Sequence, residues 1–219
     1  GLFTATSYAG SGANLTNLPS TSTADIRSAA LLQIGSNENL GLGTNAVNSI
    51  TSGQNNIGIG FNALTATTSG SYSTALGYGA LAQNTTGENL GVGHSALAAN
   101  TTGTDNTAVG RYGALMANTT GNYNTALGRS ALGANTTGTE NVAVGYLALD
   151  ANTTANSNTA VGAHSLSANT TGTSNTGIGE AALLTNITGQ RLTAVGKDAL
   201  RLNTGSFNTA VGSFCLDAN

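Results

Sequence analysis

A repeat of about seventeen residues fills most of this 219-residue chain and limits its fold more than any other feature. Segments related to NTAVG recur along the chain, and the steps between their glycines are 17, 17, 16, 17, 18, 17, 17, 17, 17 and 16 residues. The eleven glycines are Gly43, Gly60, Gly77, Gly93, Gly110, Gly128, Gly145, Gly162, Gly179, Gly196 and Gly212. So regular an array predicts units that stack on their neighbours and excludes a globular domain.

The three residues before each glycine predict a short strand. The first is Thr or aliphatic, the second is Gly or Ala and the third is always aliphatic, as in Thr107-Ala108-Val109. Alternation with a period of two is typical of a strand whose faces differ. We expect the aliphatic face to supply core residues, and the small face to lie against another backbone or be buried between chains.

The rest of each unit predicts a bend, a second segment and a turn. Ala-Leu follows three and four places after the glycine, as in Ala131-Leu132, and its leucine is expected in the core; an inserted residue near Arg111 displaces one copy. Asn-Thr-Thr-Gly comes next, and it predicts a turn because Asn and Gly tolerate positive φ. We therefore predict an all-β fold, a β-solenoid or β-roll with coils of about 17 residues.

The repeats divide the chain into two parts. Residues 37–219 hold the eleven coils, the last of them cut off midway, and residues 1–36 form a connector or cap. Within the connector, ADIRSAALLQIG predicts a short helix or strand that caps the first coil. Each coil has only two large apolar residues to bury, and the free energy gained from burying them is small compared with the entropy lost on ordering the coil. We therefore also predict an obligate oligomer.

Composition excludes several classes of function. Only 7% of residues are charged and the formal net charge is −3, so neither nucleic acid nor an anionic membrane is an expected partner. No apolar run approaches the ~18 residues of a membrane span. The recurring GLG, GIG and GVG lack the helix and lysine of a phosphate-binding loop, so we expect no nucleotide and no other cofactor.

The tandem units resemble a known class of fibre repeat. NTTGTDNTAVGRYGALMANTTGNYNTALGRSALGANTTG is similar to the head repeats of trimeric autotransporter adhesins, and more so to arrays in phage tail fibres and bacterial surface fibres that often precede an endosialidase-type chaperone domain. The resemblance covers roughly residues 37–219 and departs from the adhesin repeat in unit length. It implies a parallel homotrimer on a virion or a bacterial surface that mediates or supports attachment to a host, with a glycan as the expected target.

Variation within the repeat points to a candidate ligand-contact stripe. Framework positions barely change, whereas rings and cations collect just after the strand-ending glycine: Phe61, Tyr78, His94, Arg111, Tyr112, Arg129, Tyr146 and Lys197. Aromatic rings stack on sugar faces, and Arg suits carboxylated or sulfated glycans. The alternative is that exposed loops collect diverse residues and the segment is a spacer.

No set of residues suggests catalysis, and we expect no enzyme. Glu88 and Asp105 fall on successive coils and would offer a cation two carboxylates, but a solvated variable position is the simpler interpretation, and no His lies at a fixed spacing from them. Cys215 occupies the Ala position of Ala-Leu and is interpreted as a small filler. The sequons at Asn84, Asn118 and Asn186 are by-products of the turn.

Two other functions stay open as alternatives. A tailspike-like glycan-degrading enzyme would need paired carboxylates across a groove, and would release reducing sugar. An ice-binding solenoid would use ranks of Thr on the turns, although Ala155 and Ile187 interrupt them, and would show thermal hysteresis.

Overall fold

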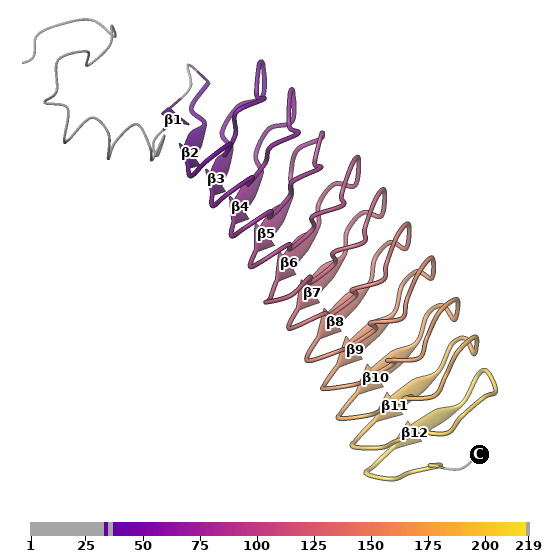
Figure 1. The fold of residues 1–219 in the computed structure, drawn as a ribbon. Coiled ribbons are helices and arrows are strands. Elements are labelled where there is room, and N and C mark those ends of the chain that lie inside the picture. The colour runs from indigo at the N-terminus through magenta and orange to yellow at the C-terminus, as the bar shows by residue number, and fades with distance from the viewer. Residues whose placement is uncertain (1–32, 35–36, 218–219) are drawn as a thin grey trace, which may run out of the picture.

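The computed structural model describes residues 33–34 and 37–217, which form an all-β parallel solenoid without a helix. Its strands are β1 (Gln33–Ile34), β2 (Leu40–Leu42), β3 (Ile57–Ile59), β4 (Thr74–Leu76), β5 (Leu90–Val92), β6 (Thr107–Val109), β7 (Thr125–Leu127), β8 (Val142–Val144), β9 (Thr159–Val161), β10 (Thr176–Ile178), β11 (Thr193–Val195) and β12 (Thr209–Val211). They form one sheet in chain order, and Figure 1 shows them stacked in a single row with the return segments behind.

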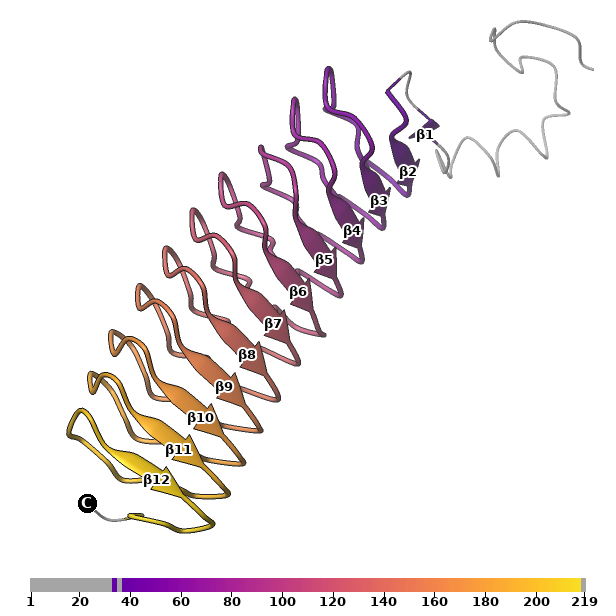
Figure 2. The ribbon, with the colours of Figure 1, turned by 180° about the vertical axis from the view of Figure 1, so that it is seen from behind.

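Equivalent residues pair on every step of the stack. Strands β2 to β12 are parallel, and Thr107 of β6 pairs with Thr125 of β7 just as Thr159 pairs with Thr176. Strand β1 pairs antiparallel with β2 and lies within the predicted connector; the rest of residues 1–36 lies outside the described residues. Ten steps at the ~4.8 Å spacing of paired strands give a stack about 50 Å long, seen from both sides in Figures 1 and 2.

The strand has the opposite orientation to the one that the sequence suggested. The central Gly or Ala is buried inside its own coil, and the Thr and aliphatic residues on either side are half-buried or exposed. A Cβ on Gly91 would lie 3.2 Å from Leu81 Cγ and 3.2 Å from the carbonyl oxygen of Ala96. The small residue is therefore required by the chain's own return segment, and the prediction that chains bury this face between them is wrong.

Leucine and alanine fill the interior. The leucine of Ala-Leu is fully buried in nine successive coils, from Leu64 to Leu200, together with its alanine or Ser165 and the central Gly or Ala of the strand. Each leucine packs in a column with its counterparts in one continuous cluster. The residue before the glycine, predicted as a second core residue, lies on the outside instead; Leu127 is 48% exposed.

Two columns of asparagine complete the interior, and neither was predicted from the sequence. One column precedes the strands and includes Asn106, Asn124 and Asn141; the backbone N–H of Asn141 donates to Asn124 Oδ1 at 3.0 Å, as Asn124 does to Asn106. The second column holds the Asn of the turns, where Asn135 Nδ2 donates to Asn118 Oδ1 at 2.9 Å. The side chains in both columns are buried. Each amide therefore joins two coils without a solvent-exposed polar group.

Left-handed backbone does not occur where the turn motif predicted it. Asn135 and Gly138 of the turn lie outside the positive-φ set, so the conformational argument for this motif was wrong. Positive φ occurs instead two positions before each strand, two positions after most strand-ending glycines, and at the core leucine. The strand-ending glycines other than Gly110 are also left-handed, with φ between 125° and 136°, and Gly128 is at 136°. Sharp corners are thus built at four points of nearly every coil.

Candidate functional site

The candidate stripe forms a ridge beside the ends of the strands, which we call the trailing ridge: Phe61, Tyr78, His94, Arg111, Tyr112, Arg129, Tyr146, His164, Glu180 and Lys197, the residues one or two positions after the strand-ending glycine. Coil stacking places successive members side by side. The rings of Phe61 and Tyr78 stack with centroids 5.2 Å apart, and those of Tyr78 and His94 lie 5.1 Å apart at 9°. His94 and Tyr112 follow at 5.8 Å and 48°.

The stacking limits what this ridge can bind. Both faces of the Tyr78 ring are covered, by Phe61 on one side and His94 on the other. A sugar that stacks on an aromatic ring needs a free face. Tyr78 therefore offers its ring edge and phenol group to a ligand, and not a ring face for stacking on a sugar.

Two arginines occupy the centre of the ridge. The guanidinium of Arg111 lies 4.4 Å from the centroid of the Tyr112 ring, and Arg129 lies 5.6 Å from Tyr112 and 5.4 Å from Tyr146. Arg111 Nη2 also donates to the hydroxyl of Tyr112 at 2.6 Å. Both arginines are exposed, and neither belongs to the two ion pairs found among residues 37–217. The rings hold these cations in place while their charge stays uncompensated.

The predicted stripe is continuous over Phe61–Tyr146 but not to Lys197. Lys197 lies three coils further on, where its Nζ pairs with Glu180 Oε2 at 3.2 Å. Sequence reasoning missed Glu180 in this slot and His164, whose ring packs edge-on against Tyr146 at 5.1 Å. Counting two positions after the glycine, as Tyr112 required, would have found His164.

A second ridge borders the beginnings of the strands. We call it the leading ridge, and it consists of the residues two positions before each strand from β2 to β12: Glu38, Asn55, Tyr72, Glu88, Asp105, Tyr123, Glu140, Ser157, Ser174, Arg191 and Phe207. All of them are left-handed, and the N–H of Asp105 donates to the carbonyl oxygen of Glu88 at 2.9 Å. The variable position of Glu88 and Asp105, five residues before the strand-ending glycine, is thus part of a regular exposed ridge.

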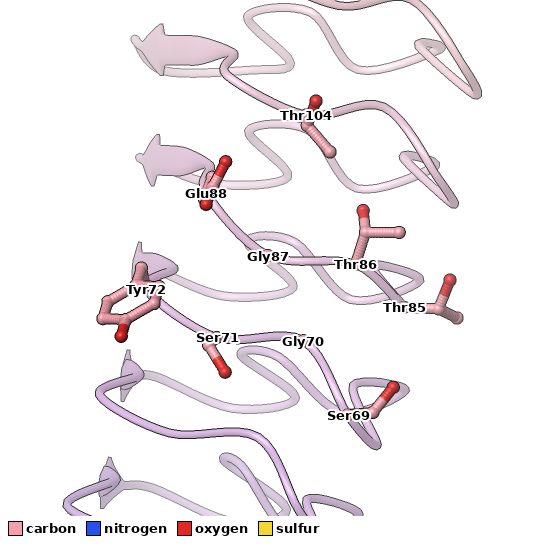
Figure 3. A pocket seen from close by; sticks show the side chains of 9 residues that line it. All are labelled: Ser69, Gly70, Ser71, Tyr72, Thr85, Thr86, Gly87, Glu88 and Thr104. Carbon is pink, nitrogen blue, oxygen red and sulfur yellow. The ribbon is translucent and has the colours of Figure 1, made fainter.

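Two shallow depressions lie along the leading ridge. One has a volume of about 360 Å³ and lies between the turn and the ridge, with Tyr72 and Glu88 at its end near the strands and Ser69 and Thr85 toward the turn (Figure 3). The other, of about 470 Å³, joins Glu88 and Asp105 to the outward residues Thr74 and Leu90. The residues described by the structure contain no group of three or more His, Cys, Asp or Glu placed to hold a metal ion.

Between the ridges lies an uncharged strip, the strand face, formed by the first and third residues of every strand from β2 to β12. Each of these residues is Leu, Ile, Val or Thr. Ile57, Leu76, Leu127, Ile178 and Val211 are exposed, and most of the others are half-buried. The third residue of these strands is aliphatic in every coil, and a continuous aliphatic column along the whole stack is unusual on the surface of a monomer.

Other candidate residues are accounted for by packing. Cys215 is half-buried against the leucine core, as a filler of the alanine position. Asn84, Asn118 and Asn186 are fully buried in the second asparagine column, so their sequons are inaccessible in the folded chain. The first Thr of the turns bonds to the next coil, as when Thr119 Oγ1 donates to the Thr136 carbonyl oxygen at 3.0 Å. Half of the Thr ranks that ice binding would need are therefore already bonded.

Comparison with protein-family models, with curated proteins and with solved structures finds no match to this chain. Among the described residues, no helix has the length and apolarity to cross a membrane. The geometry of the strand face and its two ridges is therefore the basis for a functional assignment.

Proposed function

We propose that this chain is a structural segment of a homotrimeric fibre, with a role in attachment outside the cell, on a virion or a bacterial surface. The observation that carries the proposal is the strand face, which exposes only aliphatic residues and Thr over eleven parallel strands. Exposing apolar surface to water is unfavourable by about 25 cal/mol per Å², and this cost recurs on every coil.

The regular spacing of the strand face argues for another copy of the chain as its partner. The same pair of residues recurs at each ~4.8 Å step along about 50 Å of the stack. Close packing along that length requires a partner with the same axial period, and a second copy has it. Three copies around an axis parallel to the stack would bury all three faces, as the resemblance to trimeric fibre repeats implies.

Measurement of mass in solution tests this assembly. Light scattering after gel filtration should give three times the chain mass of 21.5 kDa. Val144→Lys places a charge on the strand face and should yield monomers, because a buried unpaired ammonium strongly destabilises an interface. Thr137→Lys, on an exposed turn, is the matched control and should remain trimeric. A monomeric wild-type chain would overturn the proposal.

A second candidate function is adhesion to an anionic glycan through the trailing ridge. The exposed and uncompensated Arg111 and Arg129, each packed on tyrosine, favour it. Binding to sulfated or sialylated oligosaccharides should then fall at least tenfold in Arg111→Ala/Arg129→Ala and should remain unchanged in Thr137→Ala. Equal binding by both variants, or none by the wild type, would leave the segment as a spacer.

A further inference from the structure

The charges on the two ridges are segregated by sign. In the coils that contain β5 to β8, the leading ridge carries Glu88, Asp105 and Glu140, and the trailing ridge carries Arg111 and Arg129. All five side chains are exposed, and none belongs to the two ion pairs found within residues 37–217. One chain thus presents acid along one border of its strand face and base along the other, at the same height.

The segregation of charge does not continue further along the stack. Beside β11 the leading ridge carries Arg191, whose guanidinium lies 5.5 Å from the centroid of Phe207, and the trailing ridge carries Lys197. Lys197 pairs with Glu180 of the preceding coil, and Asp198 pairs with Arg201 at 3.4 Å, so the trailing side here has little free positive charge. The segregated charges are therefore confined to the coils that contain β5 to β8.

A cyclic assembly brings these two borders together. When copies surround an axis parallel to the stack with all strands running in the same sense, the end of each strand points toward the beginning of a strand in the next copy. The trailing ridge of one copy then faces the leading ridge of its neighbour. At equal height Arg111 of one copy faces Asp105 of the next. Arg129 is level with Tyr123 and lies one coil from both Asp105 and Glu140.

We propose that the two ridges form an electrostatic seam between neighbouring parallel copies. In this seam Arg111 of one copy faces Asp105 of the next, and Arg129 lies within one coil of Asp105 and Glu140. The seam adds charge complementarity to the strand face, whose residues are uncharged. The inference rests on the trimer proposed above, and it competes with the glycan for the same arginines.

Charge reversal tests the seam. Arg111→Glu/Arg129→Glu places acid against acid, and Glu88→Lys/Asp105→Lys places base against base. Either pair should raise the dissociation constant of the trimer about tenfold or more at low ionic strength, and less in 0.5 M salt, because salt screens exposed charges. The combined four-residue variant keeps the net charge and restores opposite signs between positions 105 and 111, while Glu140 stays acidic beside position 129. Its dissociation constant should therefore fall by about threefold or more from that of either parent pair, without full return to the wild-type value.

Each result is decisive for a different claim. A wild-type monomer overturns the trimer itself. A wild-type trimer whose dissociation constant is unchanged by either reversal, or whose combined variant is not rescued, overturns the seam and leaves the trimer standing. Rescue by the combined variant supports the seam when both parent variants also keep the wild-type circular dichroism, because misfolding of a parent is then excluded.

Disulfide trapping measures the register directly. In a Cys215→Ala background, Asp105→Cys/Arg111→Cys places thiols on opposite borders at one height, too far apart across the strand to join within a chain. Mild oxidation should link these chains into a covalent trimer on a non-reducing gel. The offset pair Glu38→Cys/Arg129→Cys, separated by five coils, should stay unlinked. A link in the offset pair instead would overturn the alignment at equal height on which the seam depends.

Discussion

The inside and the outside of this solenoid follow different rules. Interior columns repeat one residue type almost without change, whereas the ridges change residue and charge from coil to coil. The difference arises because an interior side chain contacts its own counterpart one coil away: Asn124 bonds to Asn106 and Asn141, and each bond needs a side chain of suitable size and polarity at the same position of the next coil. Information about partners is therefore concentrated on the outside, where neighbouring coils need not match.

The largest effect is expected at the strand-ending glycine. Gly128 has φ of 136°, and a Cβ there would lie 2.5 Å from the carbonyl oxygen of Gly145 in the next coil. Gly128→Ala should therefore cost about 4 kcal/mol or more of unfolding free energy, from backbone strain and overpacking together. Gly133→Ala is the control, because Gly133 is half-buried, lies outside the positive-φ set and holds a slot where other coils have larger residues. Urea unfolding that shows equal losses would contradict this account.

The next largest effect is expected in the leucine column. Leu132 is fully buried, and Leu132→Ala should cost about 3 kcal/mol because it leaves a cavity between rigid coils. Leu202→Ala removes the same atoms from a side chain that is 45% exposed, and should cost less than about 1 kcal/mol. Thermal melting of the two variants measures the difference. A similar shift in both would mean that the core packs loosely.

A smaller loss is expected in the asparagine column. Asn124→Ala removes the acceptor of the Asn141 N–H and the donor to the Gly138 carbonyl oxygen, and should cost about 2 kcal/mol because buried polar groups lose their partners. Asn124→Ser should cost less, since Ser73 occupies this column naturally and its Oγ accepts from the Asn89 N–H at 3.4 Å. Hydrogen exchange at the Asn141 amide should quicken in the alanine variant. Unchanged exchange would show that the bond contributes nothing.

The smallest effect is expected on the trailing ridge. Tyr78→Ala removes a stacked but 55% exposed ring and should cost no more than about 1 kcal/mol. Thr137→Ala, on an exposed turn, is its control. If calorimetry found a loss of about 3 kcal/mol or more of unfolding free energy, the stacked rings would stabilise the fold as strongly as the interior does. The contrast between inside and outside would then not hold.

The sequence was sufficient for the architecture but not for the direction in which the strand faces. Glycine spacing predicts stacked parallel strands, because a fixed period leaves few other folds. Alternation alone does not show which face of the strand is inside. Thr107 and Val109 look like core residues, but the return segment lies so close to the strand that only a small residue such as Ala108 fits on the inner face. The asparagine columns were hidden for a related reason, since a polar residue that bonds to its own copy has no partner in a single unit.

The candidate stripe was predicted in part. Counting from the glycine found Phe61, Tyr78 and His94, because side chains at one slot must be neighbours in a stack. It could not foresee that the rings would cover one another, since the ring spacing depends on the distance between coils and not on residue type. The edge-on contact of His164 with Tyr146 likewise needed coordinates, although the position of His164 two residues after its glycine could be counted in the sequence.

In-register pairing of identical positions makes the length of this molecule adjustable in fixed steps. A gene that gains or loses one seventeen-residue unit joins Asn to Asn, Leu to Leu and strand to strand wherever the break falls, so the chain lengthens or shortens by ~4.8 Å with the same interior. Recombination alone can therefore change the length of the stack. The ridges are not preserved in the same way, because an added coil displaces every later charge by one step on both borders at once.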